Sequence, residues 1–276
     1  MDTCDQGHFA AKQLFSDLSI LRWSHGSRFR VAVAKSAPFR GQRILDYGCG
    51  DATYFQMLLQ SGHAPASMVG AELDPNVIRA NETKFAKSRQ VSFIPLAELD
   101  HPRQQEAYDA VVCMEVFEHL VDPAKYLDHM CALIKPGGRL LLSVPVEIGL
   151  PVVVKLSVRR LAAMRGIHGY DSTIPYTWGE LFKSLFAGSQ QHIPRVKHVS
   201  PDGSPPVHCH KGFNWKMLRE LIAKRMNIEQ VSGSPVQWLS PALGSQVWFE
   251  AVKPLGTSRR SGKSQTQSQS QAVVNA

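Results

Sequence analysis

Two glycines and two carboxylates follow apolar runs of this sequence, and their types are suited to binding a polar ligand. Asp46 closes one apolar run and is followed by Gly48 and Gly50, and Glu72 closes a second run. Glycine permits positive φ angles and a close approach of the backbone, and a carboxylate accepts hydrogen bonds from two hydroxyl groups. The spacing predicts a strand, a ligand-cradling turn, and a helix whose first N–H groups face an anionic part of that ligand.

A denser group follows the apolar run 108–114, in the pattern Glu115-x-x-Glu118-His119. Two carboxylates and an imidazole within one turn can converge on Mg²⁺ or Mn²⁺, and His210, in a later His-Cys-His segment, is a further candidate ligand. A bound cation would lower the pKa of a hydroxyl group and orient it for attack. The alternative is metal-free: His119 and Glu115 are then the catalytic residues, with His119 as a general base, or His119 only caps a helix.

Apolar runs and helical patterns alternate through most of the chain. Strands are predicted over 43–46, 67–73, 91–96, 108–114, 139–144, 228–231 and 245–252, and helices over 53–60, 75–88, 123–134, 150–164 and 214–224. Such alternation is typical of parallel strands joined by right-handed crossovers. We therefore predict an α/β fold: a doubly wound, mostly parallel, Rossmann-like sheet of seven strands with helices on both faces. Ligands bind beyond the carboxyl ends of such strands, which brings the residues above into one site.

The sequence also suggests how the chain is divided. Residues 1–40 are expected to be helical, with a second segment over 28–36 after Gly26 and a break at Pro38, and residues 41–254 to form the main domain. Within that domain, 147–212 is rich in Gly, Pro, His and Ser and is expected to be a substrate-side insertion or lid. Residues 255–276 are Ser- and Gln-rich and are expected to be disordered. Four large aromatic residues of the second half are candidates to line a pocket, with packing in the core as the favoured interpretation for each: Trp178, Phe182, Trp215 and Trp238.

Composition limits the environment more than the function. The formal net charge of +8 favours contact with phosphates, nucleic acid or anionic membranes without selecting among them. The five scattered cysteines give no disulfide framework, and no secretory signal is visible, so a cytoplasmic protein is expected. No stretch approaches the roughly 18–20 apolar residues of a membrane span. The basic apolar segment 150–160 is compatible with peripheral membrane contact, although a helix covering the substrate pocket is the favoured interpretation.

Five ordered blocks resemble the class I S-adenosylmethionine-dependent methyltransferases. The blocks are Ile44-Leu45-Asp46-Tyr47-Gly48-Cys49-Gly50, Val69-Gly70-Ala71-Glu72-Leu73-Asp74-Pro75, Tyr108-Asp109-Ala110-Val111-Val112-Cys113-Met114-Glu115, Glu118-His119-Leu120-Val121-Asp122-Pro123 and Leu133-Ile134-Lys135-Pro136-Gly137-Gly138. The resemblance implies S-adenosylmethionine as cofactor, bound by Arg28, Asp46, Gly48, Gly50, Glu72, Leu73, Glu98 and Met114. It implies that Glu72 binds the ribose hydroxyls and that Asp46 lies near the methionyl amino group.

Two positions depart from the family pattern. Ala52 replaces a glycine that is common at the end of the first block. Ala97 stands where many relatives have an acid that binds the adenine amine, so Glu98 or a backbone carbonyl is expected to take that part.

Within the superfamily, the chain most resembles the ubiquinone-biosynthesis O-methyltransferases, through Arg28 and the block 113–119. The Glu115-x-x-Glu118-His119 pattern also resembles the metal motif of small-RNA 3′-terminal 2′-O-methyltransferases. We predict methyl transfer to an oxygen of a small aromatic, lipid-like or glycan-pathway acceptor.

Two alternatives remain open. One is a metal-dependent RNA 2′-O-methyltransferase, and the other is a cofactor-binding regulatory or assembly protein without turnover. A nucleic-acid partner is not favoured, because the sequence has no separate RNA-binding module and no dense basic patch with interleaved aromatic residues.

Overall fold

The computed structural model describes residues 19–164, 176–195, 197–198, 206–236, 238 and 240–255, with only the backbone for 19–25 and 158–164. The expected helical pattern before residue 19, the expected disordered tail after residue 255 and parts of the expected lid lie outside the described residues.

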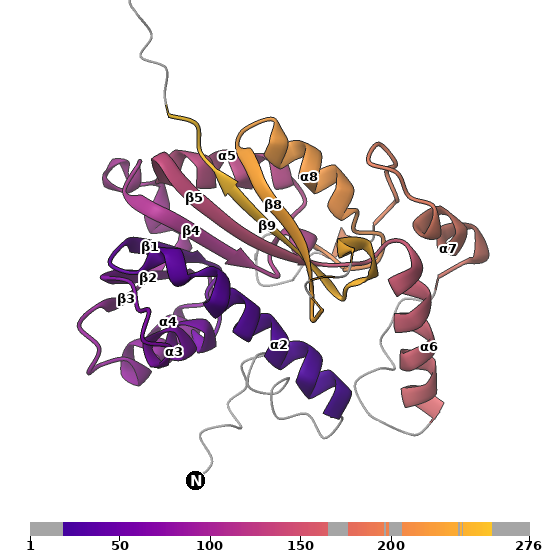
Figure 1. Cartoon of the computed structure of the whole chain (residues 1–276), viewed down its shortest axis with the longest axis horizontal. Helices are drawn as coiled ribbons and strands as arrows, with labels where there is room; N and C mark the ends of the chain where they lie inside the picture. Colours follow the sequence, from indigo (N-terminus) through magenta and orange to yellow (C-terminus); the bar gives the residue numbers. More distant parts are fainter. Residues whose placement is uncertain are drawn as a thin grey trace, which may run out of the picture.

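A seven-stranded sheet forms the centre of the molecule (Figure 1), in the order β3-β2-β1-β4-β5-β9-β8. Its strands are β1 (Arg43–Tyr47), β2 (Ser67–Glu72), β3 (Val91–Pro95), β4 (Tyr108–Met114), β5 (Ile134–Pro145), β8 (Asn227–Ser234) and β9 (Gln246–Val252). The first five strands are parallel, and only β9 runs against its neighbours β5 and β8. The predicted fold class is confirmed. The chain order reverses between β1 and β4, where doubly wound sheets bind their ligands.

Helices cover both faces of the sheet (Figure 1). One face is covered by α2 (Ser19–Lys35), α3 (Thr53–Gln60) and α4 (Pro75–Lys84), and the other by α5 (Pro123–Leu133) and α8 (Trp215–Ala223). Each face has its own apolar cluster, so both layers are stabilised by burial of large side chains. Two of these helices begin at an aspartate cap followed by proline: Asp74 accepts the Asn76 N–H at 2.8 Å, and Asp122 accepts the Lys125 N–H at 3.1 Å.

The remaining elements follow β5 and lie at one end of the sheet, to the right in Figure 1. They are α6 (Leu150–Met164), α7 (Trp178–Leu185) and the short antiparallel pair β6 (Lys197–His198) and β7 (Val207–His208). Across the described residues, no helix combines the length and the apolar character that crossing a membrane requires.

Three expectations from the sequence are wrong. Helix α2 runs unbroken through Gly26, because packing of Phe29 and Ala32 against the α3 layer outweighs the penalty of about 1 kcal/mol for a helical glycine. Strand β5 begins at Ile134 rather than at 139, because Gly137 and Gly138 exchange backbone hydrogen bonds with Lys253 beyond β9.

The third error concerns the aromatic side chains. Trp178, Phe182 and Trp238 do not pack in the core but are 87%, 67% and 85% exposed, and only Trp215 is buried. Apolar residue type alone therefore misplaced three of the four rings.

Candidate active site

The turn after β1 requires glycine for two separate reasons. Gly48 has φ of 78°, and a Cβ there would stand 2.7 Å from the Cγ2 of Val116. Gly50 has φ of 51°, and no atom lies within 4 Å of the place where its Cβ would be. The N–H groups of Gly48 and Cys49 both donate to the Ala71 carbonyl, at 2.9 and 3.1 Å, which binds the turn to β2. The result is a fixed turn with bare backbone facing open space.

Glu72 stands beside this turn at the end of β2. Its Oε2 accepts the Gly50 N–H at 2.9 Å, and its Oε1 accepts the Leu73 N–H at 2.7 Å. Each carboxylate oxygen has further lone pairs, so the fixed carboxylate can still accept one hydroxyl per oxygen. This geometry suits the two hydroxyls of a ribose. The Leu73 side chain, next to Glu72 in the chain, is 61% exposed.

Asp46 is fully enclosed beneath the turn. Neither of its carboxylate oxygens has a hydrogen-bond partner among the described residues. Burial, with smaller contributions from Glu72 and Asp51, raises the pKa of Asp46 to about 8. A buried carboxylate without a partner is costly, and a bound cation removes that cost. The Asp46 oxygens, the bare turn and Glu72 therefore fit the ammonium and ribose groups of S-adenosylmethionine.

Arg28 and Glu115 approach this turn from opposite elements. The guanidinium of Arg28, on α2, lies 3.4 Å from the Glu115 carboxylate, and both side chains are largely buried. Glu115 has φ of 57°, a strained conformation for a residue with a side chain, directly after β4. The Ser143 hydroxyl lies 3.5 Å from the same carboxylate. Met114, which is half-buried, is the last residue of β4 and directly precedes Glu115.

Glu98 follows the next strand, β3. It belongs to a short 3-10 turn after β3 and forms an ion pair with Arg103 at the surface. Its expected contact with the adenine stays a prediction.

Two residues that support the turn were missed by sequence reasoning. Asn81 on α4 is buried, and its Nδ2 donates to the Gly50 carbonyl at 2.7 Å. Lys84, one turn further, donates to the Asp51 carbonyl at 2.9 Å. The signal available was the position of Asn81, a polar residue on the same helix face as the buried Val77 and Ile78.

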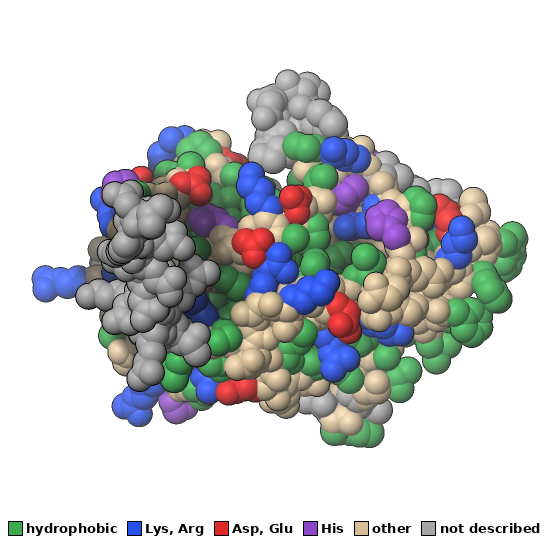
Figure 2. Space-filling model, turned by 90° about the horizontal axis from the view of Figure 1, so that it is seen from above, with side chains coloured by type: hydrophobic (Ala, Val, Ile, Leu, Met, Phe, Trp, Pro, Cys, Tyr) green, Lys and Arg blue, Asp and Glu red, His purple; other side chains and the backbone are tan. Residues whose placement is uncertain are grey.

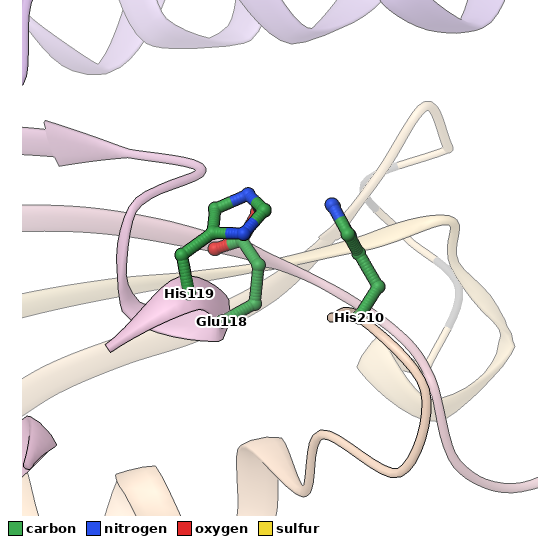
Figure 3. A group of neighbouring side chains, drawn as sticks. All are labelled: Glu118, His119 and His210. Carbon is green, nitrogen blue, oxygen red and sulfur yellow. The ribbon is translucent and has the colours of Figure 1, made fainter. Parts of the chain in front are cut away.

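A second group of side chains lies beyond β4 (Figure 3). Glu118 and His119 come from the turn η4 (Phe117–His119), and His210 comes from the segment after β7; one ligand atom of each lies within 4.8 Å of the others. Neither carboxylate oxygen of Glu118 has a hydrogen-bond partner among the described residues, and the nearer ring nitrogen of His119 is 3.9 Å away. Burial, reinforced by Glu115, raises the pKa of Glu118 well above its ordinary value.

The two histidines face each other. Their rings are 4.6 Å apart between centroids and nearly perpendicular. The Nδ1 of His119 lies 3.2 Å from the His208 carbonyl, which can only accept, so we assign the proton to Nδ1 and the lone pair to Nε2. Burial lowers the pKa of His119, which favours the neutral ring.

Arg195 joins the two segments that bring these side chains together, and no local sequence pattern predicts this role. Its guanidinium donates to the Cys209 carbonyl at 2.7 Å and to the Glu118 carbonyl, and it lies over the Phe213 ring at 5.3 Å. The residues that it connects are 77 and 14 positions away along the chain.

Glu147 and Lys155 form a further pair beyond β5. The Lys155 ammonium donates to the Glu147 carboxylate and to the Val146 carbonyl, both at 2.9 Å, and Glu147 is almost completely buried. This pair fixes the start of α6 against the end of the sheet.

A protein-family model described as a methyltransferase domain matches residues 23–184. The chain belongs to this methyltransferase family. The prediction of a class I S-adenosylmethionine-dependent methyltransferase is therefore confirmed.

Named relatives agree with this membership. The ubiquinone biosynthesis O-methyltransferase of Xylella fastidiosa (strain 9a5c) is 36% identical over 113 residues, which cover 40% of this methyltransferase and 45% of that protein. The protein of the same description from Bordetella pertussis is 29% identical over 180 residues, 60% of this chain and 74% of the relative. The first of these alignments thus spans less than half of the relative's length.

A solved structure shows the same fold. Magnesium protoporphyrin IX methyltransferase from Synechocystis PCC 6803, solved with bound SAH, superposes with a TM-score of 0.53 at 15% identity, over 88% of this methyltransferase and 93% of that chain. At this identity the likeness concerns the fold alone.

Proposed function

We propose that this methyltransferase transfers the methyl group of S-adenosylmethionine to an oxygen of a small aromatic or lipid-like acceptor, with His119 as the general base. The observation that carries the proposal is the orientation of His119: its Nδ1 faces the His208 carbonyl, which leaves Nε2 as a proton acceptor. The description of the aligned relatives as O-methyltransferases supports oxygen as the accepting atom.

The cofactor side of the proposal rests on the buried polar groups around the β1 turn. Asp46 would receive the ammonium group, Glu72 the ribose hydroxyls, and the backbone at Gly48 and Gly50 the methionyl part. The bound cofactor supplies a methyl group on a sulfonium, so the chain has to orient the acceptor and take up its proton. Further contacts with the same cofactor are proposed for four other residues: Arg28, Leu73, Met114 and Glu98.

The acceptor side of the proposal rests on His119 and Glu115. A hydroxyl group loses its proton as its oxygen takes the methyl group, and a neutral imidazole can receive that proton. The lowered pKa of His119 favours the neutral form near pH 7. Glu115, which is paired with Arg28, is proposed to orient the acceptor.

A second candidate is metal-dependent O-methyl transfer, and one observation favours it. Glu118 is buried with two unpartnered oxygens next to His119 and His210, and this set of one carboxylate and two imidazoles suits Mn²⁺ or another transition metal rather than the oxygen-preferring Mg²⁺. A cation bound there would lower the pKa of an acceptor hydroxyl, and His119 would be a ligand rather than a base. Glu115 was a predicted ligand as well, but its carboxylate lies against Arg28 and outside this group. For the metal-dependent mechanism, an RNA 2′-hydroxyl is the alternative methyl acceptor.

The cofactor assignment is tested by calorimetry with S-adenosylmethionine. Glu72→Ala is expected to weaken binding about 100-fold, since two hydroxyl contacts to a charged acceptor are lost. Glu229→Ala, which removes a surface carboxylate paired with Arg139, is the matched control and should bind normally. Unchanged affinity in Glu72→Ala would contradict the assignment.

Chelation with EDTA distinguishes the mechanism with His119 as general base from the metal-dependent mechanism. With His119 as base, His119→Ala is expected to lower turnover about 100-fold or more, with cofactor affinity unchanged and no effect of EDTA. If EDTA or Glu118→Gln abolishes turnover and Mn²⁺ restores the chelated enzyme, the metal-dependent form replaces the first proposal.

The acceptor is identified by transferring a labelled methyl group to RNA, lipid and small-molecule fractions of a cell extract. Label in the lipid or small-molecule fraction is expected. Label in RNA would favour the RNA alternative, and cofactor binding with no transfer to any fraction would favour a regulatory or assembly protein.

A further inference from the structure

Large apolar side chains are exposed together at the end of the molecule that carries α6 and α7. Eleven large apolar side chains are exposed among the described residues, and six of them lie on α6, α7 with its cap, and the adjacent turn η5 (Pro241–Leu243). We call these six the apolar end surface: Leu150, Val154, Trp178, Phe182, Phe186 and Leu243. Helix α6 packs against both α7 and η5, so the three elements form one end of the molecule. Figure 2 shows hydrophobic side chains gathered at that end, on the right. A concentration of this kind usually marks an interaction site.

Helix α7 presents its aromatic residues in a fixed orientation. Trp178, Phe182 and Phe186 recur at every fourth position and therefore share one side of the helix, with exposed fractions of 87%, 67% and 65%. The rings of Phe182 and Phe186 are 4.9 Å apart. The opposite side is anchored: Ser184 is buried, and its carbonyl accepts the Gly149 N–H at 2.8 Å. The rings therefore point away from the body of the protein.

The charges of these helices favour one kind of partner. The sequence of α6 contains three basic residues and no acidic one, of which Lys155 is paired with Glu147, and α7 adds the exposed Lys183. The acidic residue of α7, Glu180, is paired with Lys211 at 2.9 Å. Exposed Trp and Phe side chains next to basic residues suit the headgroup region of an anionic bilayer.

We propose that α6 and α7 dock this methyltransferase onto an anionic lipid bilayer, with Trp178, Phe182 and Phe186 inserted at the level of the headgroups. The inference rests on the proposed lipid-like acceptor and deepens it, because it specifies an acceptor dissolved in the membrane. The Glu180–Lys211 pair ties α7 to the segment that carries His210, so the docked helix lies next to the acceptor side of the site.

The test is flotation of the full chain with vesicles. Wild-type protein is expected to float with vesicles of phosphatidylcholine and phosphatidylglycerol in equal parts, and much less with phosphatidylcholine alone. Trp178→Ser/Phe182→Ser/Phe186→Ser should lower the partition coefficient at least about tenfold, and Lys183→Glu by a smaller factor. Leu255→Ser removes an exposed apolar side chain near Gly137, away from the apolar end surface, and should float like wild type. Calorimetry with S-adenosylmethionine checks that each variant is folded.

The outcomes separate the docking from the proposed function. Equal flotation of the triple variant and wild type, or no flotation of wild type, would overturn the docking, whatever the methyl-transfer assay shows. Flotation that depends on the three rings, in a protein that transfers no methyl group to lipid, would support the docking and contradict the lipid-like acceptor. A wild-type dimer in sedimentation that becomes monomeric in the triple variant and does not float would assign the surface to a second copy of the chain and overturn the proposal.

Discussion

The proposed donor half and the proposed acceptor half of the site are built in different ways. On the donor side, Gly48, Gly50 and Glu72 lie at adjacent strand ends, and the N–H groups of the turn donate to the Ala71 carbonyl and to the Glu72 carboxylate. On the acceptor side, His119 meets His208 and His210 where Arg195 links the η4 turn to a segment about 90 residues further along the chain. Backbone contacts between neighbouring strands follow from the sheet itself, whereas the acceptor side depends on a few long-range side-chain contacts.

This difference bears on how each half is expected to tolerate change. The donor turn leaves little room for a substitution, since its glycines are fixed by φ angle and by close contact. The acceptor segments can vary as long as their few connecting side chains remain. The following substitutions test that contrast, from the largest expected effect to the smallest.

Gly48→Ala should damage the donor side most. The new Cβ would meet Val116 at 2.7 Å in a backbone conformation that favours glycine. We expect cofactor affinity to fall about 100-fold and stability to fall by about 2 kcal/mol, measured by calorimetry and urea unfolding. Gly62→Ala has a similar φ of 75° with no atom within 4 Å, so it should lose only about 1 kcal/mol and bind the cofactor normally. Normal cofactor binding by Gly48→Ala would contradict the proposal that this turn holds the methionyl part of the cofactor.

Asp46→Asn should weaken cofactor binding about tenfold or more and change the number of protons that are released when the cofactor binds. With a pKa of about 8, Asp46 is mostly protonated at pH 7 in the free protein, and binding an ammonium group favours its ionised form. Wild type should therefore release up to about one proton per cofactor bound at pH 7. Calorimetry in buffers of different ionisation enthalpy measures this number. Equal proton release by Asp46→Asn would show that another group titrates.

The same substitution should affect stability in the opposite direction. The folded-state pKa of Asp46 lies above its unfolded value, so the folded protein binds the extra proton, and its stability falls as pH rises from about 4 to about 8. Relative to wild type, Asp46→Asn should therefore gain about 1.4 kcal/mol of stability for each pH unit between pH 4 and pH 8, with little difference at pH 4. Urea unfolding of the cofactor-free proteins at the two pH values gives the comparison, and an equal difference at both would contradict it.

Arg195→Lys should affect the acceptor side alone. A lysine keeps the charge but cannot match the guanidinium fork that reaches two carbonyls, so one of the two connections is lost. We expect kcat/KM to fall about tenfold, the loss of one charged hydrogen bond, with cofactor affinity unchanged. Arg225→Lys, at the surface pair with Asp128, is the matched control and should retain full activity. A parallel loss of cofactor affinity in Arg195→Lys would show that the two halves are not independent.

Glu180→Gln should have the smallest effect. Hydrogen bonds from Thr177, and then from Lys211, lower the pKa of Glu180 to about 2. The stabilisation is complete above the unfolded pKa of about 4.5 and is lost as pH falls toward 2, the usual direction for a depressed acid. Because the pair is partly exposed, the variant should lose less than about 1 kcal/mol at pH 7 and nothing near pH 2, measured by urea unfolding. A loss that persists near pH 2 would mean that the capping geometry, and not the charge, is what matters.

The sequence by itself determined the sheet and the donor side. Apolar runs that alternate with helices leave parallel strands as the packing solution, and parallel strands bring Asp46, Glu72 and Glu115 to one edge. Gly48 was recognisable for a local reason, because a tight turn beside a ligand requires glycine.

Only the tertiary structure decided the acceptor side and the apolar end surface. The partners of Arg195 lie far from it along the chain, and no local pattern encodes which carbonyls a guanidinium will reach. Residue type predicted burial for Trp178 and Phe182, but the side that α7 presents to the body is set by the anchor at Ser184. Local chemistry therefore fixes strand ends and turns, while long-range packing decides which side chains meet across the site and which remain exposed.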